Sequence, residues 1–384
     1  MDADILIKDG RILDTAQGID GIGDLAIKGD RVLSVGESLA IKAAIVIDAR
    51  DCIISPGLID NHLHMFADGT DAGIDPNVAL LPNGVTTAVE GGSPGSSNYE
   101  LYRKVVMNGS RVRIKCYISV SPTGMSTRKY PENVNPDFYD GERLQILFDK
   151  YPDELLGLKL RLSKEIAGDM NARPLEETIN LAGKIGCRIV VHTTNPSIDM
   201  ESIAGMLRPG DVFCHAFQGK GHTIIGLDGR VKPGIKAAKD RGIIFDVCNG
   251  SYNFAFRVAR AALADGFLPD VISTDLNTLN MYKHPVISMP YLMSKYINMD
   301  MAIEEVFRSC TQTPALLMGM EGKIGTIVPG AFADVAIFKL INHDAVFYDY
   351  LNDYVRGSKL LVPQMTIKDG IIMFRQVSFN NENR

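Results

Sequence analysis

The sequence predicts an α/β fold: a (β/α)8 TIM barrel with a small β-sandwich domain that the two ends of the chain form together. Both ends contain short alternating segments separated by Gly and Asp, which is typical of antiparallel strands. The middle contains about eight apolar, strand-like runs that alternate with helical segments over roughly 250 residues. We therefore expect a composite β-sandwich of residues 1–52 and 325–384 and a barrel of residues 53–324.

The strands of the β-sandwich are expected where apolar and polar residues alternate between turn signals. Turns are expected at Asp9-Gly10 and at Gly29-Asp30, because Asp and Gly favour the left-handed backbone that tight turns need. The same alternation of apolar and polar residues occurs again near the C-terminus. The expected strands are 5–8, 11–13, 25–27, 31–35 and 44–47 at the start of the chain, with two further strand-like regions at 324–340 and 365–372.

The barrel strands are expected where apolar runs are followed by helical periodicity. The candidate strands are 52–59, 84–91, 113–120, 155–162, 187–194, 211–217, 243–249 and 270–275, and the clearest helices are 175–184, 203–207, 235–240 and 254–264. Strands separated by helices form a parallel sheet. A doubly wound sheet is the alternative, but no GxGxxG follows its first strand and no Walker A loop is present. The glycine-rich segment 91–95 is read as a strand-exit turn, with a phosphate-binding loop as its alternative.

Composition and charge favour a small molecule as the partner of this chain. The formal net charge of −6 and the absence of a dense Lys/Arg block argue against nucleic acid or an anionic membrane as partner. Six scattered cysteines without a CxxC pair indicate buried thiols in a reducing cytoplasm. The acidic N-terminus and the lack of a long apolar run favour a cytoplasmic location.

His62 and His64 are the first candidate metal ligands. Residues i and i+2 of a strand share a face, so both imidazoles would project from the end of the first barrel strand toward one point. Two neutral imidazoles that converge suit a divalent transition metal. An HxH pair alone is a weak signal, because either histidine can be an ordinary core or surface residue.

Further candidate ligands lie at the same end of other predicted strands. Lys159 lies inside the apolar run 156–162, and His192, His215 and Asp275 end the strands that carry them. Because chemistry in a barrel is confined to the carboxyl ends of its strands, these side chains would converge on the HxH pair. The candidate site therefore comprises His62, His64, Lys159, His192, His215 and Asp275.

The order HxH, Lys, His, His, Asp on strands one, four, five, six and eight resembles the amidohydrolase superfamily of metal-dependent barrel hydrolases over nearly the whole chain. The segments 56–60, 329–330 and 333–334 are also similar to that superfamily. More narrowly, segments 84–87, 158–161, 215–220 and 270–275 resemble a bacterial deacetylase-like group related to dihydroorotase and enamidase.

The resemblance implies a binuclear metal centre. A carbamate formed from Lys159 and CO2 would bridge two divalent ions; burial makes this addition possible because it favours the neutral amine. His62, His64 and Asp275 would hold the first ion, and His192 and His215 the second. A hydroxide between the ions would be the nucleophile, and Asp275 would take its proton and deliver it to the leaving group. Zn2+ is expected, and Mn2+ or Fe2+ would also fit this ligand set.

Substrate-binding residues are expected around the mouth of the barrel. Arg161 lies two residues after Lys159 on the same strand face, where a guanidinium suits a substrate carboxylate; a structural ion pair is an equally good interpretation. The long aperiodic segment 121–141 is a candidate lid. The remaining candidates are Asn249, Ser251, Tyr252, Asn277 and Gln218, with Lys220 and His222 next to the last of these.

These observations predict a hydrolase for an acyl or acetyl amide or ester of a small carboxylate-bearing compound. A cyclic-amide hydrolase of the dihydroorotase, dihydropyrimidinase or enamidase type is the alternative. A catalytically silent scaffold relative is a third possibility, but it would be expected to lack ligands, and none is missing here. Similar proteins form homo-oligomers, and we expect one here too.

Overall fold

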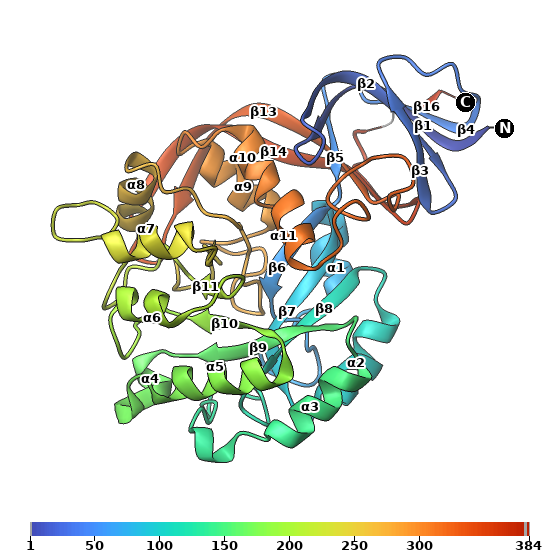
Figure 1. Cartoon of the computed structure of the whole chain (residues 1–384). Coiled ribbons are helices and arrows are strands. Elements are labelled where there is room, and N and C mark those ends of the chain that lie inside the picture. Colours follow the sequence, from blue (N-terminus) through green and yellow to red (C-terminus); the bar gives the residue numbers. More distant parts are fainter. Residues whose placement is uncertain (1, 380–381, 384) are drawn as a thin grey trace.

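The computed structural model describes residues 2–379 and 382–383 and contains two sheets (Figure 1). One sheet has nine strands, which come from the two ends of the chain, and the other has seven strands, which come from the middle. The expected α/β organisation is confirmed, as is the pairing of the two ends in one β structure. No helix in the described part of the chain is both long and apolar enough to cross a membrane.

The nine-stranded sheet follows the order β15-β14-β13-β5-β1-β2-β3, and β4 pairs with β1 and β16. Its strands are β1 (Ala3–Asp14), β2 (Ile19–Lys28), β3 (Arg31–Gly36), β4 (Ala43–Asp48), β5 (Ile53–Pro56), β13 (Val335–Tyr348), β14 (Tyr354–Lys368), β15 (Ile371–Arg375) and β16 (Glu382–Asn383). Ile5, Ile7, Ile54, Val335 and Ile367 belong to its buried core.

One of the two predicted turns in this sheet is wrong. The Gly29-Asp30 turn joins β2 to β3 as expected. The Asp9-Gly10 pair instead lies inside β1, where the register with β2 shifts between Ile7 and Gly10. Asp9 has a left-handed φ of 60°, and its N–H donates to Asp24 Oδ1 at 3.0 Å. The same residue preference that suits a turn therefore produces a β-bulge here.

The seven-stranded sheet is parallel throughout and follows chain order, without the reversal of strand order that marks a doubly wound sheet. Its strands are β6 (Leu58–Leu63), β7 (Val85–Gly95), β8 (Arg113–Ser119), β9 (Leu155–Arg161), β10 (Arg188–His192), β11 (Val212–Cys214) and β12 (Ile244–Asp246). The helices are α1 (Pro76–Leu80), α2 (Tyr99–Val105), α3 (Gly141–Lys150), α4 (Lys164–Ala167), α5 (Arg173–Ile185), α6 (Met200–Met206), α7 (Pro233–Asp240), α8 (Phe256–Ala264), α9 (Met289–Ile297), α10 (Ile303–Arg308) and α11 (Gln312–Leu317). In Figure 1, α2, α3 and α5 pack outside β7 to β10.

The predicted first barrel strand, 52–59, is two strands. Its first part, β5, pairs with β13 in the nine-stranded sheet, and its second part, β6, pairs with β7 in the parallel sheet. The break lies at Gly57, whose N–H donates to Asp334 O at 2.8 Å. A Cβ on Gly57 would lie 2.2 Å from Thr86 Oγ1, so the close approach of the chain to β7 requires glycine here.

The predicted eighth strand, 270–275, is absent from the described structure, although its backbone lies between both edges of the parallel sheet. Val271 forms a single parallel bridge with Asp246 of β12. On the other side, Asp275 N–H donates to His62 O at 2.7 Å, and His64 N–H donates to Leu276 O at 2.9 Å. The left-handed φ of 54° at Asp275 interrupts the ladder, and the segment still places Asp275 beside the end of β6.

Candidate metal centre and active site

All six predicted ligands line one cavity of about 430 Å³ at the carboxyl ends of the parallel strands. Each is at most 9% exposed. His62 belongs to β6 and His64 follows it, Lys159 lies in β9, His192 ends β10, and His215 follows β11. Because the carboxyl ends of parallel strands lie at one edge of the sheet, they bring together ligands that lie far apart in the sequence.

His62 faces Lys159 within the cavity. The Nε2 atom of His62 lies 3.0 Å from Lys159 Nζ, and its Nδ1 atom lies 3.5 Å from Cys214 Sγ. Burial lowers the pKa of His62, and the nearby Lys159 charge lowers it further. Its neutral imidazole can thus accept at Nε2 and donate at Nδ1 toward the sulfur.

Two glycines make room for this contact. A Cβ on Gly91 would lie 2.4 Å from His62 Nε2, and a Cβ on Gly92 would lie 2.5 Å from Lys159 Cγ. Gly92 also has a φ of 97°, which side chains rarely adopt. The glycine-rich segment after Glu90 thus forms the wall of the cavity next to His62 and Lys159. Gly91 and Gly92 both line the cavity.

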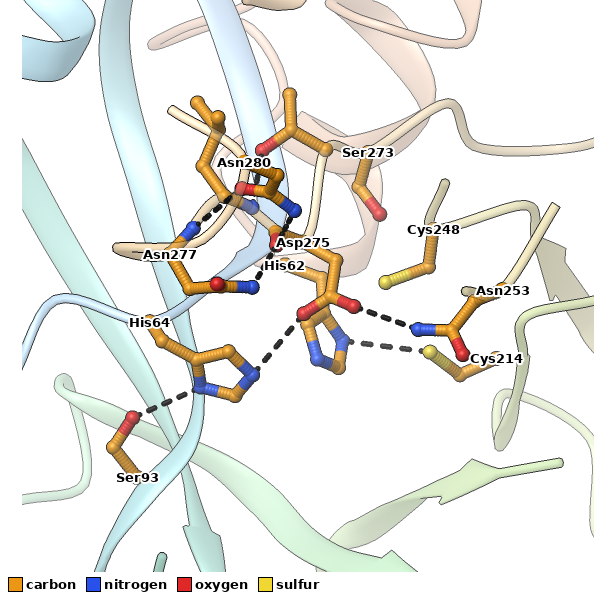
Figure 2. A network of polar contacts seen from close by, with 12 residues as sticks. His62, His64, Ser93, Cys214, Cys248, Asn253, Ser273, Asp275, Asn277 and Asn280 are labelled. Atoms are coloured by element: carbon orange, nitrogen blue, oxygen red, sulfur yellow. Dashed lines mark hydrogen bonds and ion pairs between the residues drawn. The ribbon is translucent and has the colours of Figure 1, made fainter. Parts of the chain in front are cut away.

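His64 and Asp275 form the second contact. Figure 2 shows Asp275 between His64 and Asn253: His64 Nε2 lies 3.1 Å from Asp275 Oδ1, and Asn253 donates to Asp275 Oδ2 at 2.8 Å. Burial alone would raise the pKa of Asp275, but the hydrogen bond and charge of His64 lower it to about 2. The pKa of His64 rises to about 9, because Asp275 and Glu90 outweigh the opposing effect of burial.

His192 and His215 form the other half of the cluster. Their ring centroids are 4.3 Å apart. His215 Nδ1 lies 2.7 Å from Cys248 O, and since a carbonyl only accepts, Nδ1 is the donor of this contact and Nε2 is the ring nitrogen left for another partner. Burial, followed by the electrostatic effects of His215 and Arg161, lowers the pKa of His192 well below its usual value. His192 in its neutral form therefore offers a nitrogen lone pair, and His215 presents its Nε2 atom.

The donor set fits divalent metal ions. His62, His64 and Asp275 each offer one ligand atom, and these atoms lie within 4.8 Å of one another. Buried imidazole nitrogens around one carboxylate are ligands that zinc and related ions prefer. His215 and Asp275 also have left-handed φ values of 66° and 54°, a cost that proteins retain mainly at functional sites.

Four of the predicted substrate-binding residues line the cavity: Arg161, Ser251, Tyr252 and Asn277. Arg161 Nη1 lies 3.4 Å from Glu132 Oε1, so the structure contains the rim ion pair that was the alternative interpretation for this residue. Its buried Nε atom has no hydrogen-bond partner in the described structure, and neither has Ser251 Oγ.

The structure places Gln218 and Asn249 outside the cavity, contrary to the prediction. Gln218 is fully buried and fixes its own loop, because its amide donates to His222 O at 2.6 Å and accepts from Lys220 N–H at 2.7 Å. Asn249 is also fully buried and accepts from Lys295 Nζ at 3.3 Å. These amides serve the protein interior, so neither is available to a substrate.

Sequence reasoning missed two polar residues next to the ligands. Glu90 is fully buried at 3.5 Å from His64 Nδ1 and accepts from the N–H of Met65 and of Ser93. An acidic residue inside the apolar run 85–90 is the same kind of signal that identified Lys159, and it would have found Glu90. Asn253 lies in a loop without such a pattern.

The candidate lid contributes five residues to the cavity lining: Met125, Thr127, Arg128, Pro131 and Glu132. The segment 121–141 thus covers one side of the site, as its length suggested. Whether it opens remains a prediction.

The chain matches known proteins over nearly its whole length. A deacetylase of Agrobacterium fabrum is 32% identical over 349 residues, which cover 90% of this chain and 85% of that protein. Residues 255–373 match the amidohydrolase family. The chain belongs to the amidohydrolase family. This amidohydrolase is accordingly a hydrolytic enzyme, and the family resemblance predicted from its motifs is confirmed.

Solved structures agree with this membership. A dihydroorotase crystal structure superimposes on the amidohydrolase with a TM-score of 0.87 and 29% identity, covering 96% of this chain and 97% of that one. An adenine deaminase crystal structure gives a TM-score of 0.90 at 24% identity, covering 98% and 100% of the two chains, which shows a shared fold.

Proposed function

We propose that this amidohydrolase is a binuclear metal-dependent hydrolase that removes an acyl group, such as acetyl, from an amide or ester of a small carboxylate-bearing compound. The observation that carries the proposal is the convergence of four histidines, one lysine and one aspartate, each at most 9% exposed, on one cavity. The hydrogen bonds from segment 271–276 to both β6 and β12 support the closed barrel that such a site requires.

In this proposal, His62, His64 and Asp275 would hold one divalent ion, and His192 and His215 would hold the other. Lys159, after its amine adds CO2 and loses a proton, would supply carbamate oxygens as further ligands. Zn2+ is our first choice of ion, with Mn2+ or Fe2+ as alternatives. When bound, the ions would make water a nucleophile at neutral pH and polarise the substrate carbonyl.

The chain's own residues then handle the proton and the substrate. The Asp275 carboxylate lies 3.1 Å from His64 Nε2, and one of its oxygens can accept a proton from water and return it to the leaving group. Asn253 holds the second oxygen by its 2.8 Å hydrogen bond, which fixes the carboxylate plane. Arg161, Ser251, Tyr252 and Asn277 are proposed to contact the substrate, and the segment 121–141 is proposed to close over it.

A second candidate is hydrolysis of a cyclic amide. The dihydroorotase structure, with 29% identity over 96% of this chain, supports it. The curated deacetylases at 30% to 32% identity favour the linear acyl substrate.

The five buried free cysteines agree with a reducing cytoplasm, where we propose that the enzyme works as a homo-oligomer.

The two candidates are separated by turnover. The enzyme, loaded with Zn2+ or Mn2+ in the presence of bicarbonate, would be assayed against N-acetyl amino acids, O-acetyl 2-hydroxy acids, dihydroorotate and hydantoins. Acetate release from the acetylated acids, lost in Asp275→Asn, supports the deacetylase proposal. Turnover of the cyclic amides alone would overturn it in favour of the alternative.

A further inference from the structure

Arg128 is the one lysine or arginine among the described cavity-lining residues whose side chain has neither an acidic nor an imidazole partner. The other such residues are already engaged: Lys159 with His62 at 3.0 Å, Arg161 with Glu132 at 3.4 Å, and Lys220 with Glu165 at 2.7 Å. The Arg128 guanidinium instead touches two neutral oxygens. Its Nη2 atom donates to Thr278 Oγ1 at 3.1 Å and to Asn277 Oδ1 at 3.4 Å.

The backbone around Arg128 is held in place by Asp71. The Oδ2 atom of Asp71 accepts from Arg128 N–H at 2.9 Å and from Thr127 Oγ1 at 3.1 Å. The carbonyl of Asp71 accepts from Thr278 Oγ1 at 2.9 Å. Asp71 is therefore used to join two loops, and its carboxylate binds the backbone of Arg128 while the guanidinium remains at the cavity.

We propose that Arg128 binds the carboxylate of the substrate, with Asn277 and Thr278 orienting its guanidinium. The proposal rests on the proposed acyl hydrolysis and assigns the anionic group of the substrate to one residue. A guanidinium binds a carboxylate through two parallel N–H donors, which gives strength and orientation. At Arg161, by contrast, an incoming carboxylate would meet the charge of Glu132, so the Arg161–Glu132 pair suits an uncharged polar part of the substrate.

The substrate class that follows is an acyl amide or ester whose leaving group carries a carboxylate. The reacting acyl carbonyl would lie deep in the cavity, near His62 and Asp275. The carboxylate would lie toward the loop side, where Arg128 and Asn277 line the same cavity as Lys159. A neutral analogue of such a substrate would lose the charge-assisted contact with Arg128 and keep its other contacts with the cavity.

The test compares matched acid and neutral probes in the metal-loaded, full-length enzyme. The probes are N-acetyl amino acids and O-acetyl 2-hydroxy acids, each paired with its carboxamide. We expect Arg128→Gln to raise KM for the acids about 10- to 100-fold, to change kcat less than about threefold, and to leave the carboxamides unchanged. Arg128→Lys should recover part of the loss, and Lys129→Gln, at the next exposed position, should change nothing.

A binding measurement on metal-depleted enzyme separates this inference from the proposed reaction. Calorimetric titration with N-acetylglycine and with N-acetylglycinamide should show tighter binding of the acid in the wild type and equal binding in Arg128→Gln. If the wild type hydrolyses no acetylated probe but keeps this preference, the proposed function fails and the inference stands. Hydrolysis without an acid preference, equal loss for both probes in Arg128→Gln, or no binding of the acid overturns the inference.

Discussion

His62 Nε2 of β6 lies 3.0 Å from Lys159 Nζ of β9, and both side chains are buried in the cavity. A lysine ammonium beside His62 would repel a metal ion, whereas a carbamate on the same nitrogen would offer it two oxygens that share one negative charge. The contact therefore links the proposed modification of Lys159 to metal binding by His62. The following predictions test this link and the residues that support it.

Replacing Lys159 should remove metal and activity together. Lys159→Ala deletes the group proposed to be shared by both ions, so we expect metal content to fall from about two equivalents to one or fewer and kcat to fall at least about 10³-fold. Elemental analysis by mass spectrometry after gel filtration gives the metal content. Lys184→Ala, at an exposed position on α5, is the control. Two retained equivalents in Lys159→Ala would contradict the bridging role.

Cys214 should support His62. Its sulfur lies 3.5 Å from His62 Nδ1, a contact that Figure 2 draws, and a partner at the second ring nitrogen orients a metal-binding histidine. Cys214→Ala removes the partner, and we expect metal affinity to fall about 10- to 100-fold, measured by competition with a chelating dye. The half-buried Cys187 is a suitable control position for the same change. Unchanged affinity would show that this contact has no orienting role.

Gly91 should tolerate no side chain. A Cβ there would lie 2.4 Å from His62 Nε2, so Gly91→Ala should displace the imidazole and lower metal content, while far-ultraviolet circular dichroism remains that of the folded protein. Gly109→Ala is the matched control, because no atom lies within 4 Å of its added Cβ. Normal metal content in Gly91→Ala would mean that His62 is not a ligand in the observed position.

Lys295 should make stability depend on pH. It is fully buried in α9, with Nζ 3.3 Å from Asn249 Oδ1 and 4.3 Å from the centroid of the Phe254 ring. Burial lowers its pKa to about 7, while the charge of Asp349 opposes the shift. Between pH 7 and about 10.5 the unfolded chain therefore binds more protons than the folded one, and this group's contribution to stability rises with pH.

Lys295→Met isolates this effect. We expect the free energy of unfolding of the wild type, relative to Lys295→Met, to increase from pH 7 to pH 10 by up to about 1.4 kcal/mol per pH unit. Urea unfolding followed by fluorescence or circular dichroism at several pH values gives the difference. A difference that stays constant across this range would show that Lys295 keeps its charge in the folded protein.

Much of the metal cluster could be predicted from the sequence, because a strand has a simple geometry. The HxH pair, Lys159, His192 and His215 all lie at or next to the carboxyl end of a regular strand, and that end of a parallel sheet is a single location. Glu90 is a further polar residue that lies buried within a strand of this sheet, β7. The position of Asp275 agrees with the prediction although its segment forms no strand in the described structure. The backbone of this segment bonds to both sheet edges and so lies where an eighth strand would lie.

The surroundings of the cluster were harder to predict, because loops are set by distant contacts. Gln218 and Asn249 follow the strands in sequence, yet both amides turn inward to satisfy buried backbone and side-chain groups. The direction of Arg128 depends on Asp71 and Thr278, which no local pattern connects to it. The Asp9-Gly10 bulge likewise required the partner strand, since the same dipeptide also favours a turn.

The most direct test of the account is a crystal structure of the enzyme grown with Zn2+ and bicarbonate, with anomalous diffraction recorded on both sides of the zinc edge. We predict two anomalous peaks in the cavity, one beside His62, His64 and Asp275 and one beside His192 and His215, with the Lys159 side chain extended by a carbamate between them. An unmodified Lys159 with one peak or none in the cavity would contradict the binuclear centre.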